Sequence, residues 1–319
     1  MTTYLLRRLA FLPLALLIAN FVGFAFAFSV SPVVQASNPY ASLQTDLPPL
    51  LPMYGDYFQG LLRGDFGQTF TRESVLEAIS RFSVASLGLL AIALALSVIF
   101  GILLGRLAVH RSRNGIAPWL TFLSTIGLAL PSFYIAILLI AILLAYFLYG
   151  TDLATPSIPF QGFGWDAHLI LPVLALAIQP TVKIARVTGG LLSEELEKQY
   201  VIAEMAFGFS FQSIKSKFAF RNIVAAVILT VAASLRLMIA ELIIIERLFN
   251  WPGIGRLIGS VLDLGSTSTD LLSPPMVAAL LTLLVGTFLL IDLLATFLAR
   301  LVDPRLRMDL GAERGKEAE

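Results

Sequence analysis

The sequence predicts an all-α, polytopic membrane protein with six transmembrane helices. Of the 319 residues, 57% are hydrophobic and only 13% are charged, and the mean hydropathy is +0.85. Soluble chains average about 45–50% apolar and about 25% charged residues, so one water-soluble core could not bury this excess. The apolar residues also fall into separate stretches, each long enough for the roughly 20 residues that a bilayer core requires.

The predicted spans are residues 9–30, 84–107, 119–148, 168–189, 223–245 and 276–301. The third is long and contains Pro131. Neither half of it convincingly crosses a bilayer with a turn between them, so we interpret it as one tilted or kinked helix.

Basic residues indicate the orientation, because cytoplasmic connections are enriched in Lys and Arg. One set of connections carries Arg7, Arg8, Arg106, Arg111, Arg113, Lys183, Arg186, Lys198, Lys215, Lys217, Arg221, Arg300, Arg305 and Arg307. The opposite set carries only Arg63, Arg72, Arg81, Arg247 and Arg256. We therefore expect both termini to be cytoplasmic.

The remaining segments follow from this topology. Residues 1–310 are expected to form a single transmembrane domain, with 31–83 external, 190–222 cytoplasmic and 311–319 a disordered tail. "VVQAS" at 33–37 is typical of a signal-peptide cleavage site, but the preceding apolar core exceeds the roughly 7–15 residues of such peptides. An uncleaved first span is favoured. In the external region, "ASNPYASLQTDLPPLLP" predicts irregular structure and "ESVLEAISRF" a short amphipathic helix at the membrane face.

Several chemistries lack the residues that they need. There is no cysteine and no G-x-x-x-x-G-K-[ST], H-E-x-x-H or G-x-S-x-G motif. The two histidines, His110 and His168, fall on opposite sides of the membrane in this topology. We therefore expect no catalytic residues, no metal site and no cofactor bound by this chain, and the net charge of +1 gives no indication of nucleic-acid binding.

The cytoplasmic segment 190–222 predicts a helix, a glycine turn and a second helix. In "LLSEELEKQYVIAEMAF" one face carries Leu192, Leu196, Tyr200, Ala203 and Phe207. Gly208 is expected to end this helix with a positive φ, and Ser210 to cap the next one. There Phe211, Ile214 and Phe218 would form an apolar stripe, with Lys215 and Lys217 in water. The pattern leaves open whether the pair lies on lipid or docks into a protein partner.

Six stretches resemble, in order, one family of transport proteins. They are "YLLRRL", "RGDFGQTF", "LALPSFYIAILL", "ARVTGGLLSEELEKQYV", "ERLFNWPGIGRL" and "VDPRLR". Together with 190–222, which resembles the cytoplasmic "EAA" loop, they are similar to the first permease subunit of dipeptide, oligopeptide and nickel ABC importers. The resemblance extends over nearly the whole chain.

This resemblance implies a type I ABC importer (MetI-like) permease fold in the plasma (inner) membrane of a bacterium or archaeon. The chain would form the pore together with a second homologous permease, and would import a solute, with peptide as the first expectation. One or two partner ATPases would bind ATP and Mg, and an external solute-binding protein would deliver the solute. The implied ATPase-coupling residues are Tyr200, Ala203, Glu204, Met205, Ala206, Phe207, Gly208, Phe209 and Ser210.

Two departures from the family pattern affect these expectations. "AEMAFG" places Met205 and Phe207 where basic residues are usual, which implies a more apolar groove on the ATPase. "SVSPVVQASNP" replaces a Pro-Gly-Asp-Pro stretch after the first span. The external surface therefore differs, and nickel, opines and oligosaccharides stay open as solutes beside peptides.

Charges within the spans are the remaining candidates for function, since each is costly in hydrocarbon. Arg236 and Glu241 lie in the fifth span and Asp292 in the sixth. They either line the translocation pathway or form a structural ion pair that joins spans or subunits. Arg236 and Glu241 are about 140° apart around one helix, and the resemblance does not supply this pair.

"NWPGIGRL" at 250–257 combines aromatic, proline and glycine residues just outside the fifth span. It predicts an interfacial anchor and turn. The resemblance implies instead an external gate contacted by the solute-binding protein, formed by Glu246, Trp251, Pro252, Gly253 and Gly255.

Two other function classes compete with this interpretation. A stand-alone ion-coupled transporter would use Arg236, Glu241 and Asp292 as its relay, but it predicts an inverted internal repeat, and none is apparent. An intramembrane enzyme would need a nucleophile–base or metal set, which the sequence lacks.

Overall fold

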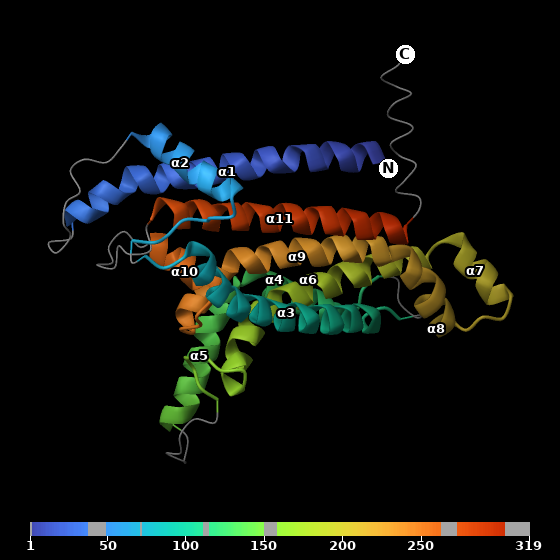
Figure 1. Ribbon diagram of the computed structural model, residues 1–319. Coiled ribbons are helices and arrows are strands. Elements are labelled where there is room, and N and C mark those ends of the chain that lie inside the picture. The colour runs from blue at the N-terminus through green and yellow to red at the C-terminus, as the bar shows by residue number, and fades with distance from the viewer. Residues whose placement is uncertain are drawn as a thin grey trace. The chain divides into compact units, whose positions relative to one another are not determined.

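The computed structural model describes residues 2–37, 49–70, 72–110, 115–149, 158–262 and 273–303. These residues are almost entirely helical (Figure 1). They divide into two compact units, each discontinuous in sequence: residues 1–87 with 251–290, and residues 88–250 with 291–319. The predicted tail 311–319 lies outside the described residues, and the single domain over 1–310 stays a prediction.

Six helical segments of the described chain are long and apolar enough to cross a membrane, so the predicted number of spans is confirmed. They are Ala10–Val30, Val75–Leu107, Ser132–Tyr149, Ala167–Leu196, Phe211–Leu248 and Pro274–Val302. Most extend beyond the predicted apolar stretches because helical hydrogen bonding continues into polar flanking residues.

The third predicted span is wrong in one respect, because 119–148 is two helices. α4 (Pro118–Ala129) ends before Leu130, which is extended at ψ 116°, and α5 (Ser132–Tyr149) begins after Pro131. Proline has no N–H to donate and disfavours helical geometry in the residue before it. In Figure 1, α5 turns away from the direction of α6 and α9, and α5 alone is long enough to span.

The first unit contains α1 (Thr2–Ser37), α2 (Leu50–Leu62), α10 (Ile254–Leu262), the start of α3 (Val75–Leu107) and the first part of α11 (Pro274–Val302). α2 begins within the stretch predicted to be irregular, and the predicted short helix "ESVLEAISRF" is continuous with α3. Asn20 joins three elements here: its amide donates to Tyr57 and Thr282 at 3.3 and 3.2 Å and accepts from Tyr54 at 3.2 Å. Burial raises the pKa of Tyr57.

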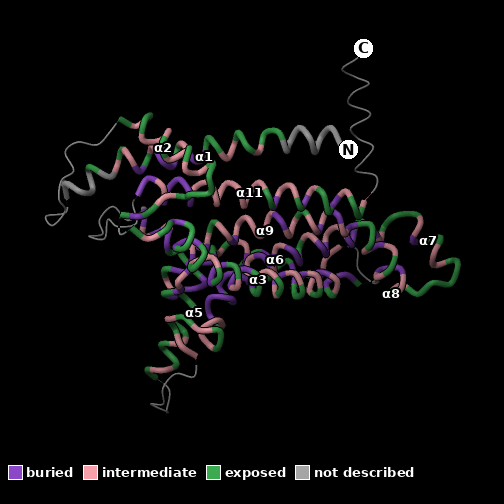
Figure 2. The backbone as a smooth tube through the Cα atoms, in the orientation of Figure 1, coloured by how far each residue is buried: buried purple, intermediate pink, exposed green. Residues whose placement is uncertain are grey.

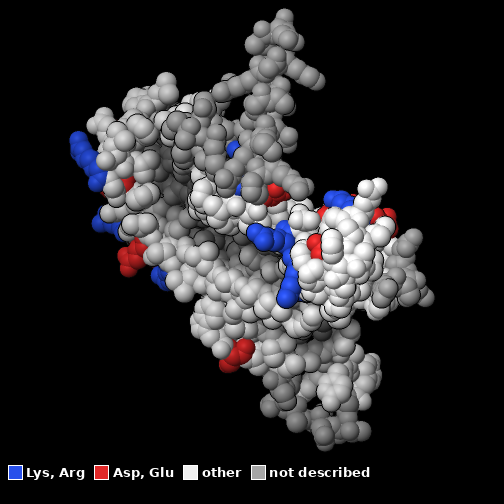
Figure 3. Space-filling model, turned by 90° about the vertical axis from the view of Figure 1, so that its right-hand side faces the viewer, with Lys and Arg blue, Asp and Glu red and all other residues white. Residues whose placement is uncertain are grey.

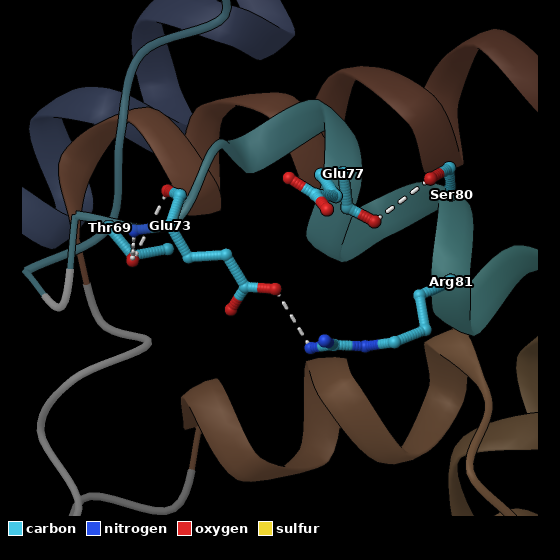
Figure 4. Close-up of polar contacts among 5 residues, drawn as sticks. All are labelled: Thr69, Glu73, Glu77, Ser80 and Arg81. Carbon is cyan, nitrogen blue, oxygen red and sulfur yellow. Dashed lines mark hydrogen bonds and ion pairs between the residues drawn. The ribbon is translucent and has the colours of Figure 1, made fainter.

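A tight turn leads into α3 (Figure 4). The Thr69 hydroxyl accepts from the Glu73 backbone N–H at 3.2 Å, and the Thr69 N–H donates to the Glu73 carbonyl at 2.9 Å. The Glu73 carboxylate extends toward Arg81 on the second turn of the helix, 3.0 Å away. The start of α3 is thus fixed by Thr69 and Glu73, which precede its first turn, and by Arg81, which follows that turn.

The second unit is built around α6 (Ile170–Leu196) and α9 (Phe220–Leu248), which pack along each other and against α4 and α5. Buried positions concentrate on α6 in this unit, whereas α7 (Gln199–Ala206) is mostly exposed (Figure 2). The rest of α3 crosses α6 closely at Gly105, where a Cβ would lie 2.6 Å from the Ala185 carbonyl oxygen. Gly101 and Gly105 form a small-xxx-small pattern of the kind that lets membrane helices approach.

Candidate functional site

The predicted helix–glycine–helix segment is present, but its first helix is not continuous. α6 ends at Leu196, and α7 begins at Gln199 after an extended Lys198. Leu192 and Phe207 therefore do not share one helix face: Leu192 is fully buried, while Phe207 is 81% exposed. No glycine or proline marks this break, and we attribute it to the tertiary contacts of Glu195 described below.

The turn after α7 has the geometry expected from its glycine. Gly208 has φ +88°, its N–H donates to Met205 O at 3.0 Å, and the Phe209 N–H donates to Glu204 O at 3.1 Å. This is a Schellman motif, in which a residue of positive φ satisfies the last helical carbonyls. The Ser210 hydroxyl then accepts from the Ser213 N–H at 3.2 Å and caps α8 (Phe211–Ser213). Both local predictions are confirmed.

Apolar side chains around this turn are largely exposed, although the Phe209 ring packs edge-on against Phe218 at 5.5 Å. Ile202, Phe207 and Phe209 are 66%, 81% and 46% exposed. Ala203 and Ala206 are exposed as well, whereas Tyr200, Glu204 and Met205 are intermediate. Figure 3 faces the end of this unit where α7 and α8 lie, and charged side chains of both signs stand among uncharged ones there. An exposed apolar cluster with polar surroundings is typical of an interaction surface.

A buried carboxylate connects this segment to the membrane helices. Glu195 is 6% exposed and accepts from Lys198 Nζ at 2.5 Å, Tyr200 Oη at 3.1 Å and Asn222 Nδ2 at 2.8 Å. The four residues come from the end of α6, the start of α7 and the start of α9. Sequence reasoning missed this Glu195 cluster, because nothing local pairs Glu195 with a residue 27 positions later.

The pKa of Tyr200 is changed by its burial and by the same buried carboxylate. Burial, followed by the negative charge of the Glu195 carboxylate, raises the pKa of Tyr200 to about 12. The phenol therefore stays protonated and keeps donating its hydrogen bond throughout the physiological range. Tyr200 also lines an open pocket of about 470 Å³ with Lys217, Phe218, Arg221 and Asn222.

The second helix differs from its prediction at one lysine. Residues Ile214–Ala219 form a π-helix that leads into α9, with Ile214 buried and Phe211 and Phe218 partly exposed. Lys217 is exposed as predicted, but Lys215 is only 7% exposed and donates to Val109 O at 2.7 Å. The prediction that Lys215 faces water is wrong because the wider π turn directs it toward the end of α3.

The intramembrane charges have separate partners. Arg236 on α9 pairs with Asp292 on α11, and their side chains are 35% and 43% exposed. Glu241 accepts a hydrogen bond from the Ser132 hydroxyl at the start of α5. The structural alternative predicted an ion pair that joins spans. The structure has such a pair between Arg236 and Asp292, and it is not the pair of Arg236 with Glu241.

The predicted gate residues divide between the two units. In the first unit Trp251 is fully buried and donates from Nε1 to Ala85 O at 3.1 Å, while the Ile254 N–H donates to Ser86 Oγ at 2.7 Å. Gly253 and Gly255 are buried, and Pro252 is partly exposed. In the second unit Glu246 is fully buried. Trp251 thus packs inside the protein and not at the lipid interface, so the prediction of an interfacial anchor does not hold for this side chain. The external gate stays a prediction, and Pro252 is the residue of the Trp251–Gly255 stretch that is open to contact.

A polar loop before α6 was not predicted as a site. Gln161 and the Gly162 N–H donate to Leu248 O and Phe249 O at 3.2 and 2.9 Å, so the loop is pinned to the end of α9. Asp166 caps the turn that follows: hydrogen bonds from the His168 N–H and ring lower its pKa. Across the described residues there is no group of three or more side chains suited to hold a metal ion.

Comparison with known proteins decides the family. Residues 97–308, more than half of the chain, match the model of the binding-protein-dependent transport system inner membrane component. The chain belongs to this family. It is the multi-pass, plasma-membrane permease component of an ABC importer, a family whose systems also contain ATPase and solute-binding partners.

Individual relatives of this permease agree with the family match. A probable peptide ABC transporter permease of Sinorhizobium fredii is 31% identical over 81% of each chain. The dipeptide transport system permease of Lactococcus lactis is 27% identical over 97% of this permease and 100% of that protein. An oligopeptide transport permease of Bacillus subtilis is 28% identical over 80% and 81%. The predicted resemblance is confirmed.

Proposed function

We propose that this permease imports a peptide, together with a second homologous permease, and is driven by ATPases that dock on residues 190–222. Both termini and this segment would be cytoplasmic, ATP and Mg would bind only in the partner chains, and a solute-binding protein would deliver the peptide from outside. The relatives named for peptide, dipeptide and oligopeptide transport support the solute class.

One observation carries the proposal: apolar side chains are exposed on a turn whose backbone is fixed. The Schellman motif at Gly208 and the Ser210 cap hold the turn, and the Glu195 cluster holds α7 against α6 and α9. A force applied at Phe207 would thus reach the start of α9 through hydrogen-bonded contacts rather than through a loose linker. This is what a lever that switches a pore between two states requires.

The translocation pathway is proposed to run along the charges on α9 and α11. Arg236 and Asp292 are partly exposed, and the Glu241 carboxylate accepts a hydrogen bond from the Ser132 hydroxyl. Charges of both signs along a pathway suit a zwitterionic solute such as a short peptide. Uptake of labelled dipeptide against labelled nickel, in vesicles supplied with the solute-binding protein and ATP, tests this class.

The docking itself is tested by changing the exposed apolar surface. Phe207→Glu should reduce recovery of the ATPases with the tagged, detergent-purified permease at least about tenfold, since interface hot spots contribute about 2 kcal/mol or more. Phe207→Leu keeps an apolar side chain and is the matched control. Equal ATPase recovery with both variants, at equal amounts of permease in the membrane, would rule out docking at this turn.

A further inference from the structure

A second pocket lies at the end of α3 beside α8 and the π-helix Ile214–Ala219. It has a volume of about 450 Å³ and combines an apolar wall with a polar rim. The wall is formed by Ile99, Ile102, Leu103 and Leu107, and the rim by Arg106, Gln212 and Lys215. All seven residues belong to the second unit.

The apolar wall is an outward-facing stripe of a membrane-spanning helix. Ile99, Leu103 and Leu107 recur at four-residue steps, and they are 60%, 49% and 54% exposed. They lie in the last turns of the candidate span Val75–Leu107. The wall therefore lies in hydrocarbon and leads up to the membrane–water interface, where the rim lies.

The rim holds two cations, Arg106 and Lys215, that pair with no carboxylate of the part of the chain that the structure describes. Lys215 is only 7% exposed, and its ammonium group donates to the Val109 carbonyl. The Arg106 guanidinium stacks over the Phe220 ring at 5.0 Å. Among the described residues neither forms an ion pair, in contrast to Glu195 with Lys198 and Arg236 with Asp292. A buried cation without a counter-charge is unfavourable, and a second cation in the same pocket adds repulsion.

We propose that this pocket binds an anionic phospholipid. The phosphate would lie between Arg106 and Lys215 with the Gln212 amide as a further donor, and one acyl chain would follow Ile99, Leu103 and Leu107. A free phosphate would satisfy the cations but leave the apolar wall unused, whereas a lipid uses both. Basic pockets at membrane interfaces select anionic headgroups in this way. The lipid would join the end of α3 to the segment that carries the predicted ATPase contact.

The experiment measures lipid retention by native mass spectrometry of the full-length permease purified with its partners. Detergent solutions containing phosphatidylglycerol or phosphatidylcholine of the same acyl chains are the probes, and glycerol phosphate is the headgroup-only probe. We expect retention of phosphatidylglycerol over phosphatidylcholine and weak competition by glycerol phosphate. Arg106→Gln should weaken phosphatidylglycerol binding about fivefold, and Arg106→Lys should retain most of it.

Lys217→Gln is the matched control, because it removes the same charge from an exposed position two residues from Lys215 that does not line the pocket. Equal retention of both lipids, or equal losses in Arg106→Gln and Lys217→Gln, would overturn the proposal. Full competition by glycerol phosphate would identify a simple anion site instead. Cross-linking of Leu103→Cys to the second permease would show that protein, not lipid, covers the wall. Arg106→Lys also reveals whether a loss reflects misfolding, because it keeps the charge.

Discussion

Residues 190–222, called the coupling segment after the role proposed for them, and the charges within the spans are held by different numbers of contacts. In the first, one buried carboxylate, Glu195, has three side-chain donors and holds three helices together. In the second, Arg236 has one acidic partner and Glu241 has one hydroxyl donor, and the side chains of the Arg236–Asp292 pair stay partly exposed. Glu195 is thus held by more contacts than any of the span charges, and this difference is the basis of the roles proposed for the two regions.

The largest effect should come from leaving a span charge without its partner. Asp292→Asn removes the acidic partner of Arg236, and a lone arginine at the centre of a helix costs about 2.5–3.5 kcal/mol on insertion scales. We expect a lower melting temperature of the purified permease and less protein in the membrane. Adding Arg236→Gln should restore much of both. A double variant no better than the single one would mean that the two charges act independently.

Glu195→Gln should have the next largest effect, because hydrogen bonds to a charged group contribute about 1.5–3 kcal/mol. The amide can accept fewer of the three donors and loses the attraction of Lys198. Hydrogen exchange of residues 199–206 should become faster while α6 stays protected. The neighbouring exposed Glu194→Gln is the matched control. Unchanged exchange in Glu195→Gln would show that the cluster does not hold α7.

Gly208→Val should cost about 1–2 kcal/mol of local backbone strain, because a β-branched residue resists the φ of +88°. A Cβ at this position meets no atom within 4 Å, so strain and not crowding is the cause. ATP-dependent uptake should fall severalfold with membrane insertion intact. Gly208→Asn, which tolerates positive φ, should transport nearly normally. Full uptake by the valine variant would exclude a lever role for the turn.

The local features of the coupling segment could be predicted, and its long-range contacts could not. Gly208 and Ser210 act through the backbone within three or four residues, so sequence rules suffice for them. Glu195 with Asn222, Lys215 with Val109 and Arg236 with Asp292 join residues that only the packing of separate helices brings together. The break between α6 and α7 was missed for the same reason, whereas the Pro131 break had a local signal.

Tyr200→Phe should have the smallest effect, about 0.5–1.5 kcal/mol for one hydrogen bond. Because the folded-state pKa of about 12 lies above the ordinary value of 10.0, this stabilisation is present below pH 10 and is lost as the pH rises through about 12. Absorbance titrations of the wild type and Tyr200→Phe at 295 nm should nearly coincide between pH 9 and 10.5. A difference of one tyrosine with a midpoint near pH 10 would contradict the burial of this phenol.

The π-helix at Ile214–Ala219 also sets how α9 is rotated about its axis relative to α8. One additional residue per turn rotates everything that follows by about 100° relative to a regular α-helix. The direction in which Arg236 points from α9 therefore depends on the direction in which α8 leaves the Gly208 turn, because the helix is continuous between them. A single-residue insertion or deletion between these points would keep both ends folded but rotate one against the other. Changing the number of residues between 210 and 236 should therefore disturb the protein more than replacing most of the residues within this segment.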